Sequence, residues 1–148
     1  MAEHVHKYQV LRESAVRGVT LCELKWIEDR ERGNLSVGEL GAGLPFAPQR
    51  YFITYDVPES DERGKHAHRV CQQFLVCVRG RCSVVVDDGK NREEFLLNRP
   101  YLGLLIPPMV WGTQFKHSQD SVLLVFASHA YDAHDYIRDY EEFKQVVQ

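Results

Sequence analysis

The sequence predicts an all-β protein, a jelly-roll barrel with one C-terminal helix, formed as a single domain by residues 1–148. Three observations predict this fold class. Short segments rich in β-branched and aromatic residues recur along the chain. Glycine-containing turns separate several of them, and helical periodicity is confined to the last part of the sequence. A chain of 148 residues can bury one hydrophobic core without disulfides or a structural metal.

The predicted strands follow one another at short intervals from the first residues to residue 128. They are KYQVL (7–11), VTLCELKWI (19–27), NLSVGEL (34–40), RYFITYDV (50–57), QFLVCV (73–78), CSVVVDD (82–88), EEFLL (93–97), YLGLLI (101–106) and SVLLVFAS (121–128). Asp88-Gly89 suits a tight hairpin turn, and Gly80 is expected to reverse the chain between two paired strands, because glycine adopts positive φ without a Cβ clash. Antiparallel strands with such turns favour a small β-sandwich or jelly roll, and the cupin-type barrel, whose mouth is a natural ligand pocket, fits best.

The last residues carry the predicted helix. Asp132 is a suitable N-cap for AHDYIRDYEEFKQVV, in which apolar side chains recur at helical spacing. These side chains are Tyr136, Ile137, Tyr140, Phe143 and Val147. The pattern predicts a helix that packs one face onto the barrel.

Composition excludes several classes of protein. The chain is 44% hydrophobic and 26% charged with a net charge of -3, and its Lys and Arg residues are scattered, which argues against nucleic-acid binding. No apolar run approaches the roughly 20 residues that span a bilayer. The N-terminal residues do not resemble a secretion signal, and the four cysteines lack zinc-type spacing. We therefore expect a soluble, cytoplasmic protein.

The segment GKHAHRVCQQ places two histidines, His66 and His68, two residues apart. Because side chains alternate along a strand, both imidazoles are expected to point into the barrel, with Ala67 outward. Imidazole can accept and release a proton near neutral pH, so the pair is a candidate acid-base device. The alternative is a pair of core histidines that hydrogen-bond their neighbours and have no chemical role.

A metal site is a further alternative for the histidine pair. Metal-binding cupins follow His-x-His with a glutamate and a later histidine. Here Gln73 occupies the glutamate position, and the segment from Met109 to Gly112 offers no histidine. Two imidazoles fall short of the three protein ligands typical of a catalytic metal site. The sequence therefore predicts no metal.

The chain resembles a family, the nucleotide-linked 4-keto-6-deoxyhexose 3,4-ketoisomerases, also called WxcM-like cupins. The resemblance runs through RGNLSVGE, LPFAPQRYFITYDVP, RGKHAHRVCQQFLVCVRGRCSVVVDDG, LLNRPYLGLLIPPMVWG and DSVLLVFASHAYDAHDYIRDYEEF. It implies an isomerase of deoxysugar biosynthesis that moves the ketone of a dTDP-linked 4-keto-6-deoxyhexose from carbon 4 to carbon 3, without a cofactor. It also implies a homodimer, in which a partner subunit could cover the edge strand 7–11.

The resemblance also assigns catalytic roles. His66 or His68 is the base near carbon 3, with His68 preferred, and the other imidazole orients the sugar or returns the proton at carbon 4. Gln73 is expected to hydrogen-bond a histidine and fix its tautomer.

The remaining candidates bind the substrate. Arg50 could hold an enediolate oxygen or a phosphate, or be only a surface charge. Relatives often carry adjacent tyrosines after this arginine, whereas this chain has Phe52 there, which leaves Tyr51 and Tyr55 as donors to a sugar oxygen. Trp111 could stack on the sugar or the base. Core packing is the alternative for all three aromatic residues.

Three other functions remain to be distinguished. A 3,5-epimerase of related fold would leave the ketone at carbon 4. A non-catalytic sugar-binding cupin module would bind the nucleotide sugar without exchanging its carbon-bound hydrogen. A metal-dependent dioxygenase or isomerase would lose activity on chelation.

Overall fold

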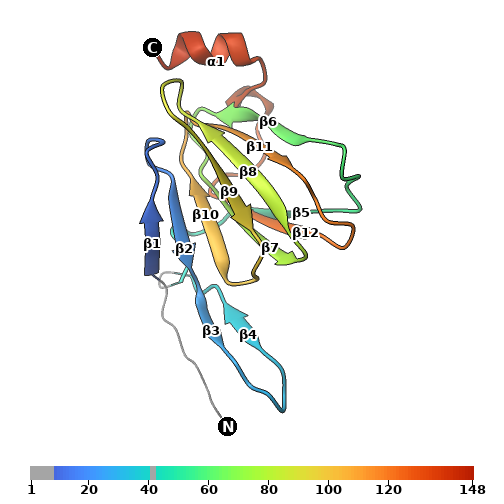
Figure 1. Ribbon diagram of the computed structural model, residues 1–148. Coiled ribbons are helices and arrows are strands. Elements are labelled where there is room, and N and C mark those ends of the chain that lie inside the picture. Colours follow the sequence, from blue (N-terminus) through green and yellow to red (C-terminus); the bar gives the residue numbers. More distant parts are fainter. Residues whose placement is uncertain (1–8, 41–42) are drawn as a thin grey trace.

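Two antiparallel sheets face each other and enclose the hydrophobic core in the computed structural model, which describes residues 9–40 and 43–148 (Figure 1). The first sheet contains, in spatial order, β1 (Gln9–Glu13), β2 (Thr20–Glu23), β10 (Leu102–Ile106), β7 (Gln73–Arg79), β12 (Val122–Ala127) and β5 (Arg50–Tyr55). The second contains β13 (Tyr136–Ile137), β6 (Arg63–His68), β11 (Trp111–Phe115), β8 (Cys82–Asp87) and β9 (Arg92–Leu97). This architecture confirms the predicted all-β class.

A small hairpin stands apart from the two sheets. It consists of β3 (Lys25–Ile27) and β4 (Leu35–Val37), which pair only with each other. Figure 1 shows it projecting from the end of the barrel opposite to helix α1 (Tyr140–Val146). The predicted segment 19–27 is therefore divided between β2, which lies in the barrel, and β3, which lies in the projection.

The strand predictions hold for most of the barrel, with two strands missed. Neither β11 nor β13 was expected, because β11 (WGTQF) is largely polar and β13 lies inside the predicted helix. Gly89, at φ 93°, lies in the turn of the predicted hairpin between β8 and β9. Gly80, at φ 68°, does reverse the chain, but β7 and β8 belong to different sheets and do not pair, so that part of the prediction is wrong. Residues 7 and 8 of the first predicted strand lie outside the described residues.

The predicted C-terminal helix is interrupted. Asp132 accepts a hydrogen bond from His134 N at 2.9 Å, but it caps only a single 3₁₀ turn, η1 (Ala133–Asp135). The chain then extends as β13, because Tyr136 and Ile137 pair with β6. Asp139 starts α1 by accepting from Glu142 N at 2.9 Å. The interruption is the reason why Tyr136 lines the cavity described below and Asp135 lies against His68.

Helix α1 closes one end of the second sheet. Phe143 is fully buried and packs in a cluster with Ala67, Trp111 and Ile137. Its ring lies 5.6 Å from the ring of Trp111. Among the described residues, no helix is long and apolar enough to cross a membrane.

Replacing Phe143 with alanine is expected to lower the free energy of unfolding by about 3 to 5 kcal/mol, since it leaves a cavity beneath α1. Urea unfolding followed by circular dichroism measures the change. Val146→Ala is the matched control, because Val146 lies in the same helix and is exposed, and its effect should stay within about 0.5 kcal/mol. Equal midpoints for Phe143→Ala and wild type would show that α1 does not stabilise the barrel.

His117 is buried away from the histidine pair, after the end of β11. It is 1% exposed, and neither ring nitrogen has a hydrogen-bond partner within residues 9–40 and 43–148. Burial lowers the pKa of His117, and the nearby charge of Arg63 lowers it further. The folded state therefore binds the His117 proton more weakly than the unfolded state does.

Acid should consequently destabilise the protein through His117. As the pH falls below about 6.5, the unfolded chain takes up a proton that the folded chain resists, so stability is lost toward acid pH by up to about 1.4 kcal/mol per pH unit. His117→Leu removes this contribution and should give a shallower acid slope in thermal or urea unfolding. His66 and His68 remain in both proteins, so the difference between the two curves isolates His117. Parallel curves would contradict the assignment.

Candidate active site

A cavity of about 300 Å³ lies between the two sheets and is lined by His66. His68 lies beside it and borders a void of about 10 Å³ that shares His66 and Gln73 with the cavity. Strands β5, β7 and β12 supply one wall, while β6, β11 and the segment around β13 supply the other. Its lining residues are Arg50, Phe52, Thr54, Arg63, Gly64, His66, Gln73, Gln114, Val125, Tyr131, Tyr136 and Arg138. Three arginines and no carboxylate are present among them, so the cavity suits an anionic ligand.

Strand β6 places both histidines on one wall. His66 and His68 face the interior with their ring centroids 4.9 Å apart, while Ala67 faces outward into the cluster beneath α1. This is the alternation predicted for His-x-His. Just before the pair, Gly64 and Lys65 both have positive φ, where the register of β6 against β11 shifts. The bulge re-aims the strand as it enters the cavity.

Asp135 holds His68 from the side away from the cavity. The Nδ1 atom of His68 lies 2.8 Å from Asp135 Oδ2, and the other carboxylate oxygen accepts from Val70 N at 2.7 Å. Because a carboxylate only accepts, Nδ1 carries the proton and Nε2 keeps its lone pair. His68 Nε2 is buried and has no partner among the described residues. The arrangement gives a histidine of fixed tautomer with a free basic nitrogen.

The two imidazoles differ in their electrostatics. Burial, and then the charge of His68, lower the pKa of His66 to about 4. Burial also lowers the pKa of His68, but Asp135 opposes this shift. Burial alone would raise the pKa of Asp135, yet its hydrogen bonds to Val70 N and His68 keep it below its ordinary value. At neutral pH Asp135 is therefore ionised and both imidazoles are neutral.

Arg50 and Tyr136 form the second polar unit of the cavity. Arg50 Nη2 donates to the Tyr136 hydroxyl at 3.2 Å, and Arg50 Nε donates to His129 O at 3.1 Å. The Tyr136 ring lies 4.4 Å from the His68 ring and 5.0 Å from the His66 ring. The guanidinium of Arg138 lies 4.2 Å from the centre of the Tyr136 ring. A fixed cation and a phenol thus lie beside the histidines.

The structure separates the predicted substrate-binding residues into two groups. Arg50 and Gln73 line the cavity, as expected. Tyr51 and Tyr55 do not: they lie on the opposite face of β5 and are 66% and 64% exposed. Trp111 likewise points away from the cavity, and packs against α1. Strand alternation is the reason in each case.

Two tyrosines from the C-terminal segment take the place of Tyr51 and Tyr55. Tyr131 and Tyr136 line the cavity, and neither was expected there. The tautomer-fixing role expected of Gln73 belongs to Asp135, which was also missed. Reading residues 133–139 as helix concealed Asp135 and Tyr136, although a β-prone Tyr-Ile pair followed by an Asp cap could have indicated the break.

The residues around the histidines do not form the metal site of a metal-binding cupin. Gln73, at the glutamate position, is a neutral amide in the cavity wall. Gly112 pairs with His66 and offers no side chain, and Gln114 of the same strand is a second neutral amide. The chemistry that these residues support is proton transfer by imidazole.

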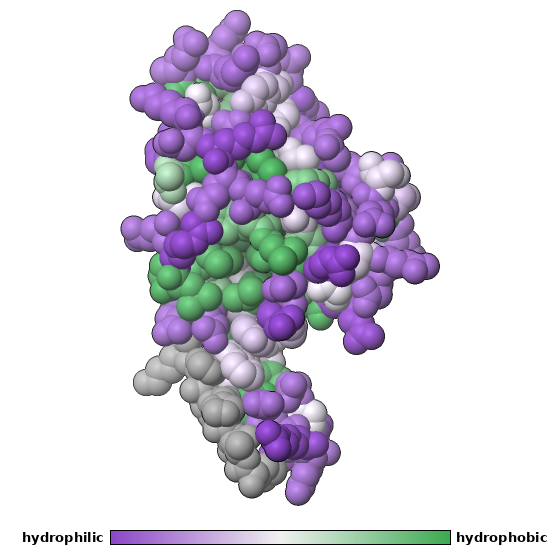
Figure 2. Space-filling view, in the orientation of Figure 1, coloured by the Kyte–Doolittle hydropathy of each residue, from purple (hydrophilic) through white to green (hydrophobic). Residues whose placement is uncertain are grey.

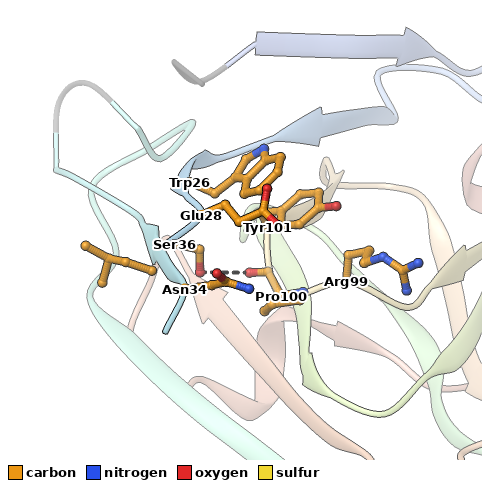
Figure 3. Close-up of a pocket in the computed structure, with 8 residues that line it drawn as sticks. Trp26, Glu28, Asn34, Ser36, Arg99, Pro100 and Tyr101 are labelled. Atoms are coloured by element: carbon orange, nitrogen blue, oxygen red, sulfur yellow. Dashed lines mark hydrogen bonds between the residues drawn. The ribbon is translucent and has the colours of Figure 1, made fainter. Parts of the chain in front are cut away.

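A second hollow, of about 390 Å³, lies at the base of the β3–β4 hairpin. Figure 3 shows the rings of Trp26 and Tyr101 lying over each other, with centroids 4.5 Å apart, and Ser36 linked to Pro100. Its lining shares no residue with the histidine cavity and includes no imidazole. Acid-base chemistry therefore belongs to the cavity between the sheets.

The fold and the cavity together define a cupin-like barrel with a ligand-sized cavity between its two sheets. More specifically, the chain belongs to the family described as FdtA: WxcM-like, C-terminal, whose model matches residues 17–148. The predicted family is confirmed.

Relatives of this chain are sugar ketoisomerases. A TDP-4-oxo-6-deoxy-alpha-D-glucose-3,4-oxoisomerase from Aneurinibacillus thermoaerophilus is 40% identical over 116 residues, which are 78% of this chain and 84% of that protein. A 3,4-ketoisomerase from Helicobacter canadensis is 35% identical, with a TM-score of 0.84 over 88% of this chain and 97% of the other. A third, from Thermoanaerobacterium thermosaccharolyticum, was crystallised as a histidine-to-asparagine variant with TDP-4-keto-6-deoxyglucose. It is 32% identical, with a TM-score of 0.85 over 88% and 94% of the two chains.

Proposed function

We propose that this chain, acting as one domain, is an isomerase that moves the ketone of a dTDP-linked 4-keto-6-deoxyhexose from carbon 4 to carbon 3. The observation that carries the proposal is the His68–Asp135 pair. His68 Nε2 has no partner among the described residues, and the His68 ring lies beside that of His66, which lines the cavity with three arginines. Moving a ketone by one carbon requires removal of one carbon-bound proton and return of another, which this pair can supply.

The arginines account for recognition of the nucleotide. A dTDP sugar carries a diphosphate, and Arg50, Arg63 and Arg138 all line the cavity. Arg63 and Arg138 are the candidates for the diphosphate, because Arg50 is already directed at the Tyr136 hydroxyl beside the histidines.

His68 is the better candidate for the base. When it takes the proton from carbon 3, the imidazolium that forms faces the carboxylate of Asp135, which stabilises it. His66 has no carboxylate partner, and burial lowers its pKa to about 4, so an imidazolium there is less favourable.

Arg50, Tyr136 and His66 are positioned to stabilise the negative charge that develops on the sugar oxygens. Loss of the carbon 3 proton gives an enediolate, and the fixed charge of Arg50 with the Tyr136 hydroxyl can stabilise it. His66 remains neutral and can still donate a ring N–H to a sugar oxygen. The hydroxyl proton on the carbon 3 oxygen passes to the carbon 4 oxygen, a transfer that neutral His66 can carry because one ring nitrogen accepts and the other donates. His68, whose added proton exchanges with solvent, then protonates carbon 4, so that the ketone stands at carbon 3 and a hydroxyl at carbon 4.

The product is expected to have the galacto configuration at carbon 4. In a gluco-configured ring the hydrogens of carbons 3 and 4 lie on opposite faces. Both imidazoles lie on the wall formed by β6, whereas the facing residues Phe52, Thr54 and Val125 offer no comparable acid. Removal and return of the proton from one face therefore give the galacto product, which ring-proton coupling constants identify.

Turnover in deuterated water tests the proposed function. With dTDP-4-keto-6-deoxyglucose as substrate, we expect deuterium at carbon 4 and the ketone at carbon 3, seen by mass spectrometry and proton spectra. An epimerase would instead exchange carbons 3 and 5 and leave the ketone at carbon 4. A binding module would bind the substrate without exchange, and either result would overturn the proposal.

The catalytic reaction is expected to need no metal ion, because Gln73 and Gly112 replace two metal ligands of other cupins. Prolonged dialysis against a chelator should leave turnover within about twofold of the untreated enzyme. Metal content is measured on the same sample to show that removal was complete. Activity that disappears and returns with one particular divalent ion would reverse the expectation.

We further propose that the enzyme is a cytoplasmic homodimer. The two edge strands β1 and β9 meet on one face, where Arg12 pairs with Glu93, and Val10, Leu11 and Leu96 are exposed. Figure 2 shows apolar side chains gathered in the middle of this face. A second copy would cover both the apolar side chains and the unpaired strand edges. The four cysteines form no disulfide within the described part of the chain, which agrees with a reducing compartment. Sedimentation as a monomer at micromolar concentration would contradict the dimer.

A further inference from the structure

A second set of chemically active groups lies behind the histidine pair. His68, Cys71 and Asp135 are all buried, and one potential ligand atom from each lies within 4.8 Å of the others. They come from the end of β6, the turn after it and η1, so the pairing of β13 with β6 brings them together. Cys71 is 2% exposed; its thiol donates to Gln72 O at 3.3 Å, and its sulfur accepts from the Ser128 hydroxyl at 3.8 Å.

The ligand types favour one class of cation. Thiolate, imidazole and carboxylate are the ligands that zinc takes in proteins, and a three-ligand site leaves a fourth position open. A void of about 10 Å³ borders His68 and Cys71, next to His66 and Gln73. This is about the space that one water molecule needs, so a small ligand in the fourth position has room.

Charge balance also permits a divalent cation. A thiolate at Cys71 and the carboxylate of Asp135 would neutralise both charges of zinc. Arg50 opposes a cation here, because it lies close enough to Cys71 for the thiol to contribute to the raised pKa of Arg50. Zinc–ligand distances of about 2.0 to 2.3 Å require His68 Nδ1 and Asp135 Oδ2, now 2.8 Å apart, to separate slightly and the Cys71 sulfur to move toward them. Rotations of the three side chains can supply this.

We propose that His68, Cys71 and Asp135 form an inhibitory zinc site. Zinc would replace the proton that His68 shares with Asp135 and take the imidazole out of proton transfer. The site differs from the metal centre of metal-binding cupins, because Cys71 and Asp135 take the place of a glutamate and a third histidine. Binding of zinc does not depend on the proposed function, whereas inhibition rests on it.

The first test measures binding alone. Cobalt, used as a spectroscopic probe for zinc, should bind the wild-type protein with a stoichiometry of one and give the near-ultraviolet absorption of a cobalt thiolate. Cys71→Ser keeps a hydroxyl that can donate to Gln72 O, and it should lose this absorption and bind zinc at least tenfold more weakly. Cys71→Ala should show the same loss of absorption and of zinc affinity, and it replaces Cys71→Ser in the test if the serine variant does not fold. Cys22→Ser, at a buried thiol of a separate cluster, should match wild type.

The second test measures turnover. Zinc should inhibit the wild-type enzyme, a chelator should restore it, and Cys71→Ser should have ordinary turnover but need at least tenfold more zinc for the same inhibition. Magnesium, which prefers oxygen ligands, should have no effect. Equal sensitivity of wild type and Cys71→Ser, absence of the thiolate absorption, or binding without inhibition would each overturn the proposal. Absence of ketoisomerase activity in the wild-type protein would instead contradict the proposed function. The cobalt spectra would still show whether the metal site exists.

Discussion

Replacing His68 with asparagine is expected to lower turnover by about a hundredfold to ten-thousandfold, the usual effect of removing a general base. Asparagine keeps some of the size and polarity of histidine but cannot accept the carbon 3 proton. The arginines proposed to bind the diphosphate are unchanged in this variant, so substrate binding should persist; a histidine-to-asparagine variant of the related Thermoanaerobacterium enzyme was crystallised with TDP-4-keto-6-deoxyglucose. Turnover and substrate affinity, measured separately, show this as a loss of kcat with little change in the dissociation constant.

The variant His66→Asn distinguishes the two imidazoles. With His68 and Asp135 intact, it should still exchange the carbon 3 hydrogen with deuterated water, while forming product more slowly, since His66 assists on the sugar oxygens. His68→Asn should lose both exchange and product. The opposite pattern would make His66 the base, and near wild-type rates in both variants would exclude the pair from acid-base catalysis.

Tyr51→Phe is the matched control for these variants. Tyr51 belongs to β5 beside Arg50, but its side chain is 66% exposed on the outer face of the strand. Removal of the Tyr51 hydroxyl should leave turnover unchanged. A large loss in Tyr51→Phe would place this face of β5 in the site after all.

Strand periodicity explains which site residues the sequence could predict. His66 and His68 share a face because they are two residues apart, and the structure bears this out. The same rule, applied to β5, shows that Arg50 and the adjacent Tyr51 cannot both face the cavity. With Arg50 inward, its partners are Phe52 and Thr54, which line the cavity. The alternation of side chains along β11 likewise points Trp111 away from the cavity and leaves Gly112 on the side that faces it.

Asp135 was harder to predict, because its position depends on contacts distant in sequence. Residues 133–147 carry apolar side chains at helical spacing, which predicts one continuous helix. Pairing of Tyr136 and Ile137 with His68 and Ala67 overrides that local preference. Only the extended segment turns Asp135 toward His68, so the fold class could be predicted from local pattern, but this part of the site could not.

Asp135→Asn is expected to lower turnover by about a hundredfold to ten-thousandfold, although the base itself is unchanged. The asparagine oxygen can still accept from Val70 N, as Asp135 Oδ1 does at 2.7 Å, so the segment should stay in place. The amide nitrogen then faces His68 and donates to Nδ1. This favours the tautomer with the proton on Nε2, where the lone pair for carbon 3 is needed. Asparagine also cannot stabilise the imidazolium.

A positioning role for Asp135 makes predictions that a purely structural role does not. In Asp135→Asn, nitrogen-15 spectra of His68 should show the proton moved from Nδ1 to Nε2, kcat should fall with KM nearly constant, and unfolding stability should change little. Asp135→Ala provides the comparison, because it also loses the bond to Val70 N and should lower stability as well as turnover. Wild-type turnover in Asp135→Asn would show that the orientation of His68 does not depend on the carboxylate. A fall in stability equal to that of Asp135→Ala, with the tautomer unchanged, would reduce Asp135 to a structural residue.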